Sequence, residues 1–118
     1  MDPGKIEILG NQIVVIGDLL VLEASILADK IKHGELDNSF EAEASKLDIN
    51  GSKLSLLGDF FIAIAATLEA QEVEGPLSQS SRDNILGDYL VVIGEFLGVK
   101  AFYENIEEEK VSAEQNKN

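Results

Sequence analysis

Three carboxylates recur at equivalent places in the chain, and their spacing is the feature that most suggests chemistry. Asp18, Asp59 and Glu95 each follow directly after a glycine, in stretches of similar sequence. Brought together, three carboxylates could bind a metal ion or share protons. A di-metal helical bundle, however, also needs Glu-x-x-His pairs. Because the chain has a single histidine, we interpret the three acids as the polar strip of otherwise apolar helices.

Other catalytic patterns are missing from the sequence. The chain has no cysteine, which excludes disulfides and thiolate chemistry. His33 sits where a helix is expected to end, and a favourable contact with the helix dipole explains it there. No Gly-x-Ser-x-Gly, Gly-x-Gly-x-x-Gly or Walker motif occurs. A glycosidase-like pair of carboxylates stays open, but we expect no enzymatic activity, no cofactor and no metal.

The three acids belong to a stretch that occurs three times, at about residues 9–24, 50–65 and 86–101. The last copy opens Leu-Gly-Asp-Tyr-Leu-Val-Val-Ile-Gly-Glu-Phe-Leu. Each copy carries small residues seven positions apart, and these are Gly10, Gly17, Ala24, Gly51, Gly58, Ala65, Gly87, Gly94 and Ala101. A seven-residue repeat of this kind is typical of the seam between packed helices.

The glycines need a physical reason, because each one inside a helix costs about 1 kcal/mol relative to alanine. Six such glycines would cost about 6 kcal/mol, as much as the net stability of a small domain. Close approach of two helix backbones could offset that cost, since helices without Cβ atoms at the contact come nearer than the usual ~8–10 Å. We therefore predict that all nine small residues are helix-packing positions.

The pattern predicts an all-α fold, an antiparallel bundle of three long helices. We expect helices over residues 3–33, residues 39–72 and from Ser80 or Ser81 onward, joined by loops at 34–38 and 71–80. Asp2 and Pro3 predict a helix start and Gly34 a left-handed helix end. Asn38 or Ser39 could cap the next helix, and Glu41 would complete a capping box with Asn38. A break at Asn50-Gly51 would instead give four helices. Residues 1–106 form one domain, and residues 107–118 an acidic, disordered tail.

The helices are apolar nearly all round, which is more apolar surface than a soluble three-helix monomer usually exposes. The surplus predicts a homo-oligomer. Lipid is the weaker alternative, because acids interrupt every segment and we expect no transmembrane segment. The net charge of −13 disfavours binding to nucleic acid. The first residues lack the pattern of a signal peptide, so a cytoplasmic location is expected.

The repeat resembles a known type of sequence. Leu-Gly-Asn-Gln-Ile-Val-Val-Ile-Gly-Asp and Ile-Leu-Gly-Asp-Tyr-Leu-Val-Val-Ile-Gly-Glu are similar to uncharacterised small Gly-heptad repetitive helical proteins of bacilli. The middle copy departs from that pattern, with Ser52-Lys53 after Gly51. The resemblance implies a bacterial, Gram-positive origin and a helical repeat, and it transfers no functional residue.

Three functions follow as hypotheses. The first is a non-enzymatic structural or self-assembling interaction protein whose partner is itself. The second is an acidic inhibitor or immunity-type protein that binds a basic partner through the charge of −13. The third is a helical bundle that binds an apolar ligand or lipid. High salt separates the first two, because apolar association persists in it and charge-driven association weakens.

Overall fold

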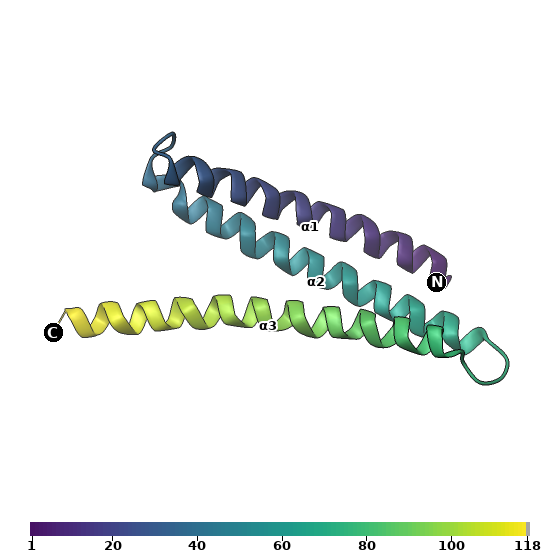
Figure 1. Cartoon of the computed structure of the whole chain (residues 1–118). Coiled ribbons are helices and arrows are strands. Elements are labelled where there is room, and N and C mark those ends of the chain that lie inside the picture. The colour runs from purple at the N-terminus through teal and green to yellow at the C-terminus, as the bar shows by residue number, and fades with distance from the viewer. Residues whose placement is uncertain (118) are drawn as a thin grey trace.

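The computed structural model describes residues 1–117. Three long helices, α1 (Pro3–Lys32), α2 (Glu41–Glu72) and α3 (Gln79–Asn116), follow one another with a short 3₁₀ turn, η1 (Asn38–Phe40), before α2. The described residues contain no strand. The predicted all-α class with three long helices is confirmed (Figure 1).

The ends of α1 form as local chemistry dictates. The Asp2 side chain accepts a hydrogen bond of 3.2 Å from the Lys5 backbone N–H, and Pro3 occupies the first turn. At the other end Gly34 adopts a φ of +73°, while the backbone N–H of Glu35 donates to the Lys30 carbonyl. This left-handed glycine ends the helix as predicted.

The start of α2 differs from the expected capping box at Asn38 and Glu41. Asp37 accepts a hydrogen bond of 2.8 Å from the Ser39 N–H and caps the 3₁₀ turn, whereas α2 itself has no side-chain cap. The capping-box prediction was wrong because the chain inserts a tighter turn before the α-helix. Helix α2 then runs unbroken through Asn50 and Gly51, so the four-helix alternative is not observed.

Helix α3 begins at Gln79, where the Ser78 side chain accepts a hydrogen bond from the Ser81 N–H. It continues to Asn116, so residues 107–116, which we expected to be disordered, are helical. Glutamate and lysine are good helix formers, and the Lys110–Glu107 pair (3.6 Å) lies in this part of the helix, while the Lys100–Glu104 pair (2.6 Å) lies just before it.

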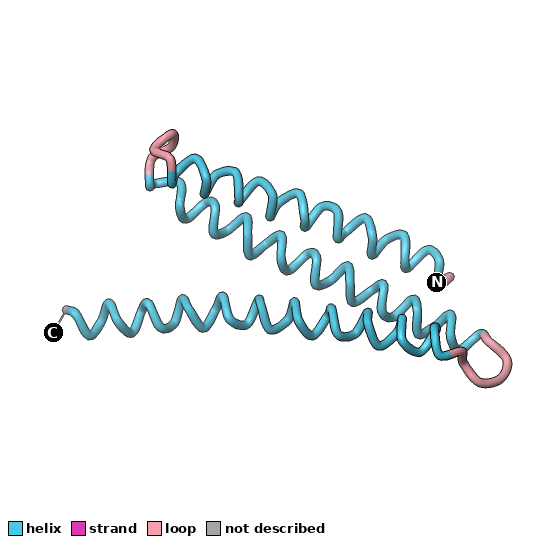
Figure 2. Tube along the Cα trace, viewed as in Figure 1, coloured by secondary structure: helices cyan, strands magenta, loops and turns pink. Residues whose placement is uncertain are grey.

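Helices α1 and α2 form a tight antiparallel pair, and α3 folds back along α2 (Figure 1). The two connecting loops lie at opposite ends of the molecule (Figure 2). Among the described residues, α3 makes close backbone contacts with α2 and none with α1. The molecule is therefore open and elongated, measuring 64 × 33 × 24 Å.

The α1–α2 pair is built on the predicted small residues. A Cβ added to Gly10 would lie 2.7 Å from the Gly58 carbonyl oxygen, and one added to Gly17 would lie 2.6 Å from that of Gly51. The same register, continued by seven residues each way, sets buried Ala24 level with Ala44 and Pro3 level with Ala65. We call these four pairs the small-residue ladder. They are Pro3–Ala65, Gly10–Gly58, Gly17–Gly51 and Ala24–Ala44.

The core that results is small. Its buried hydrophobic residues are Ala24, Ala44, Ile49, Ala63 and Ala65, and no large side chain of the described chain is fully buried. Close backbone approach, and not interdigitated large side chains, therefore stabilises the α1–α2 pair.

Candidate functional site

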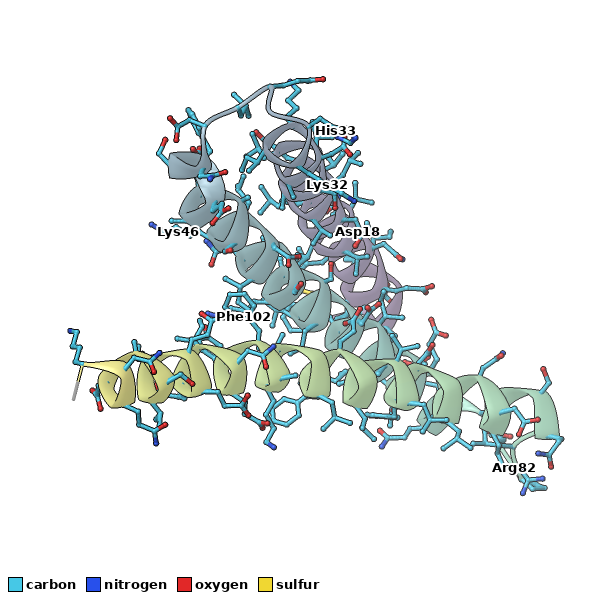
Figure 3. All side chains as sticks on the ribbon, turned by 60° about the vertical axis from the view of Figure 1, so that its left-hand side comes forward. Asp18, Lys32, His33, Lys46, Arg82 and Phe102 are labelled. Carbon is cyan, nitrogen blue, oxygen red and sulfur yellow. The ribbon has the colours of Figure 1, made fainter. Side chains whose placement is uncertain are left out.

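The three recurrent acids come together where the helices meet. Ser55 on α2 donates a hydrogen bond of 2.9 Å from its hydroxyl to Asp18 on α1. Glu95 on α3 faces Asp59 on α2 and is also close enough to Asp18 to feel its charge. One Glu95 carboxylate oxygen is buried without a hydrogen-bond partner. Asp18, from α1, is visible in Figure 3 on the helix above α3.

This environment alters the protonation of the α3 acids. Burial, then a hydrogen bond with Asp59, then the negative charges of Asp59 and Asp18 raise the pKa of Glu95 to about 7. Burial, followed by the charges of Asp59 and Glu7, also raises the pKa of Asp88. Both shifts have the same cause, since a carboxylate removed from water next to other carboxylates resists ionisation.

The chemistry available to this cluster is limited. A cavity of about 300 Å³ lies between the three helices, lined by Asp18, Val21, Ser52, Ser55, Glu95, Gly98 and Val99. Within residues 1–117, no group of three or more His, Cys, Asp or Glu side chains is arranged to hold a metal ion. The hydroxyl of Ser55 is engaged with a carboxylate, with no histidine beside it. The raised pKa of Glu95 makes this cluster a point of pH sensitivity at the junction of the helices.

His33 lies apart from the acids, at the far end of α1 (Figure 3). Its Nδ1 atom is 2.9 Å from the Asp29 carbonyl oxygen and 3.3 Å from the Asp29 carboxylate. The side chain thus closes the last turn of the helix, in agreement with its interpretation as a helix-end residue.

The structure brings together only part of the predicted helix-packing set. Gly10, Gly17, Ala24, Gly51, Gly58 and Ala65 are all buried in the α1–α2 pair. In contrast, a Cβ added to Gly87 or Gly94 would meet nothing within 4 Å, and Ala101 is exposed. Within residues 1–117 the glycines of the third copy are therefore not packed against another helix, and a packing role for Gly87, Gly94 and Ala101 stays a prediction. Helix α3 contacts α2 through a different face.

That other face of α3 holds contacts that sequence reasoning missed. Tyr89 and Thr67 share a hydrogen bond of 2.9 Å between their hydroxyl groups, which ties α3 to α2. Lys53 lies 5.0 Å from the centre of the Tyr103 ring, in a cation–π contact between the same helices. The sequence signal was weak, since each pair is made of single polar or aromatic residues on otherwise apolar surfaces.

Large apolar side chains cover the outside of the molecule. On α1 the exposed set is Ile8, Leu9, Val15, Ile16, Leu19, Leu22 and Ile26. On α3 the exposed set within the repeat is Leu86, Leu90, Val91, Ile93, Phe96 and Leu97. An apolar groove of about 500 Å³ also opens between α2 and α3, lined by Lys53, Leu56, Leu57, Phe60, Val92, Ile93 and Phe96. These apolar surfaces are candidate binding surfaces.

Two helical segments, Pro3–Lys32 and Asn38–Glu72, are long and apolar enough to cross a membrane by length and composition. Helices with these properties also occur in soluble proteins, where they are mostly buried. Comparison of the chain with protein-family models, with curated proteins and with solved structures found no match.

Proposed function

We propose that this chain is a non-enzymatic, self-assembling structural protein whose working form is a homo-oligomer. The observation that carries the proposal is the inverted distribution of apolar side chains. Large apolar residues such as Ile16, Leu19 and Leu97 are 54–59% exposed, while the interior is made mainly of alanine and glycine. Contiguous apolar surface of this kind on a soluble protein marks a binding interface.

The exposed area supports the same proposal. The chain has a solvent-accessible surface of 8304 Å². A compact monomer of 12.8 kDa is expected to expose about 6,300 Å², so the surplus is about 2,000 Å². Obligate homo-oligomeric interfaces bury about 2,000–5,000 Å² in total, or about 1,000–2,500 Å² for each chain. Association with one or more further copies would remove a surplus of this size.

A second copy suits these faces better than a basic partner does. The exposed apolar sets on α1 and α3 present aliphatic and aromatic side chains, and the carboxylates of the chain are spread over all three helices. A basic partner would be recognised through those carboxylates and would leave the apolar faces in water. Another copy of the same chain supplies an apolar face of matching length and chemistry.

The dependence of thermal stability on protein concentration tests this proposal. If subunits fold and assemble together, the melting temperature rises as the concentration increases from about 1 to 100 μM, since association stabilises the folded state by mass action. A melting temperature independent of concentration over that range contradicts self-assembly. Flotation with phosphatidylcholine vesicles serves as the parallel control: we expect the protein to stay in the aqueous fraction, and its recovery with the vesicles would assign the apolar faces to lipid.

The groove between α2 and α3 favours one alternative function, the binding of a small apolar ligand. Its volume of about 500 Å³ and its lining by Phe60 and Phe96 suit an aliphatic or aromatic molecule. Nile red fluorescence measures this directly. Saturable binding of one dye per chain that Phe60→Glu abolishes would support a carrier, whereas dye binding unchanged by Phe60→Glu would remove the groove from consideration.

A further inference from the structure

The tight α1–α2 pair shows how two copies of the repeat bind each other. Gly10 faces Gly58 and Gly17 faces Gly51 in antiparallel register, with backbone atoms of one helix where the other would carry a Cβ. The chain contains a third copy of the same pattern on α3, in which Ser80, Gly87, Gly94 and Ala101 follow one another at seven-residue steps. Among residues 1–117 the glycines of that copy face no partner, because nothing lies within 4 Å of a Cβ added at Gly87 or Gly94.

The unpaired copy lies on the outside of α3. At 3.6 residues per turn, Gly94 is roughly half a turn around the helix from Val92, which lines the groove against α2. Leu90, Leu97 and Val91 flank the glycines and are 57%, 55% and 49% exposed. This face of α3 is therefore apolar and narrow at the glycines.

We propose that α3 pairs with α3 of a second copy, antiparallel, in the register that α1 and α2 use within the chain. This inference rests on the proposed self-assembly and specifies one of its interfaces. Gly87 of one copy would face Gly94 of the other, and Ser80 would face Ala101, on both sides of a twofold axis. The four steps on α3 then form four pairs, as many as the small-residue ladder of α1 and α2.

Symmetry and charge select the antiparallel direction. The four positions are evenly spaced, so a reversed copy of the helix presents the same four positions in the same places. The contact is therefore isologous and closes as a dimer. Parallel pairing would place the two acidic ends of α3, each with Glu107, Glu108 and Glu109, side by side. Antiparallel pairing puts those like charges at opposite ends of the contact and aligns the helix dipoles favourably.

The side chains on α3 suit this geometry. The outer pairs of the α1–α2 ladder, Pro3–Ala65 and Ala24–Ala44, carry Cβ atoms, so Ser80 and Ala101 fit the equivalent outer positions. Four residues after each ladder glycine of α1 stands a valine, Val14 or Val21. Position 98 on α3 is the equivalent flank after Gly94, and a side chain there is compatible with pairing.

Cysteine cross-linking tests the direction and register. The chain lacks cysteine, so Ser80→Cys and Ala101→Cys can be prepared as single-cysteine variants, mixed when reduced, and oxidised after subunit exchange. We expect a disulfide-linked dimer in the mixture alone, because a disulfide needs Cα atoms about 4.4–6.8 Å apart. In either variant alone the two cysteines would lie about 30 Å apart, the length of 21 helical residues. Cross-linking of one variant with itself would overturn the antiparallel register.

A matched pair of substitutions tests the face. Gly94→Val places a side chain on the central contact twice by symmetry, so we expect the dissociation constant to rise at least about tenfold. Ala113→Val enlarges an exposed side chain on the same helix beyond the four contact positions, and we expect little change. Equal effects of the two substitutions on association would overturn the proposal.

The cross-linking result also separates this inference from the proposed function. An oligomeric mass in light scattering without the mixed disulfide would leave self-assembly in place and refute the α3–α3 contact. A monomeric mass would refute both. The expected result is an oligomer with the mixed disulfide, in which helix content measured by circular dichroism equals that of the parent.

Discussion

Gly17→Ala is the substitution for which the ladder makes its sharpest prediction. Alanine normally stabilises a helix by about 1 kcal/mol relative to glycine. At Gly17, however, the added Cβ would lie 2.6 Å from the Gly51 carbonyl oxygen, 2.6 Å from the Ser55 Oγ and 2.7 Å from the Ser55 backbone nitrogen. Real Cβ atoms essentially never approach other atoms so closely. Two of the three neighbours are backbone atoms, so rotating a side chain cannot relieve the contact.

The helices must therefore separate, and the close pairs on either side of Gly17 loosen with them. Overpacking of this kind costs about 1–3 kcal/mol in a well-packed core, and contact with backbone places Gly17 at the upper end. After the gain in helix propensity, we expect a net loss of about 1–2 kcal/mol. For a domain of this size the melting temperature falls by about 4 °C per kcal/mol, or about 4–8 °C in all.

Gly98→Ala is the matched control, because a Cβ there meets nothing within 4 Å. The same chemical change should raise the melting temperature by up to about 4 °C through helix propensity alone. Circular dichroism melts of parent and variants at one protein concentration make the comparison. A Gly17→Ala variant that melts at or above the parent temperature would refute close backbone packing as the basis of the α1–α2 pair.

Two further predictions concern the junction of α3 with the other helices. The folded-state pKa of Glu95, at about 7, lies above its ordinary value of 4.5. Between these two pH values the folded state binds more protons than the unfolded state, so the free energy of unfolding increases as the pH falls from 8 to 5. Glu95→Gln should raise the melting temperature at pH 8 and make it depend less on pH. Glu114→Gln, at an exposed position, should leave the pH dependence of the melting temperature as in the parent. An unchanged pH dependence in Glu95→Gln would contradict the raised pKa of Glu95. Tyr89→Phe removes the 2.9 Å hydrogen bond to Thr67 and should lower the free energy of unfolding by about 1 kcal/mol. Tyr103→Phe should lower it little, because the Tyr103 hydroxyl makes no hydrogen bond in the described structure. Equal urea midpoints for the two variants would contradict a stabilising role for the hydrogen bond to Thr67.

Much of the fold could be predicted because local signals and the repeat agree. Asp2 with Pro3 and Gly34 fix the ends of α1 through capping and left-handed backbone, both of which depend on neighbouring residues only. The continuity of α2 through Asn50-Gly51 followed from the phase of the repeat, and its physical reason is the position of Gly51 against Gly17. At this position the close packing of the two helices outweighs the preference of Asn50-Gly51 for a turn.

The partner of each small-residue stripe could not be predicted in the same way. All three helices carry the same stripe of small residues, and any two of these stripes could pack against each other. The sequence therefore does not tell which helix keeps an unpaired stripe. The structure shows that Gly87 and Gly94 are the unpaired ones. The end of α3 was missed for another reason, since the absence of apolar residues after Ile106 says nothing about the helix propensity of a Glu- and Lys-rich segment.

The candidate site was visible in sequence only as three equivalent acids. Their equivalence predicted a shared polar strip, and Ser55 with Asp18 shows that the strip points toward a neighbouring helix. Which acids would approach each other depends on how α3 crosses α2, and a repeat pattern carries no information about that crossing. The rise in the pKa of Glu95 is a consequence of the crossing.

The molar mass in solution tests the central claim most directly. Light scattering coupled to gel filtration, at low micromolar concentration in both 0.1 M and 1 M NaCl, would count the copies. Self-assembly through apolar faces predicts a discrete mass of at least twice 12.8 kDa in both salts, because burial of apolar surface is not screened by salt. A mass of 12.8 kDa in both would contradict the account, since the exposed faces of α1 and α3 would then have no second copy to cover them.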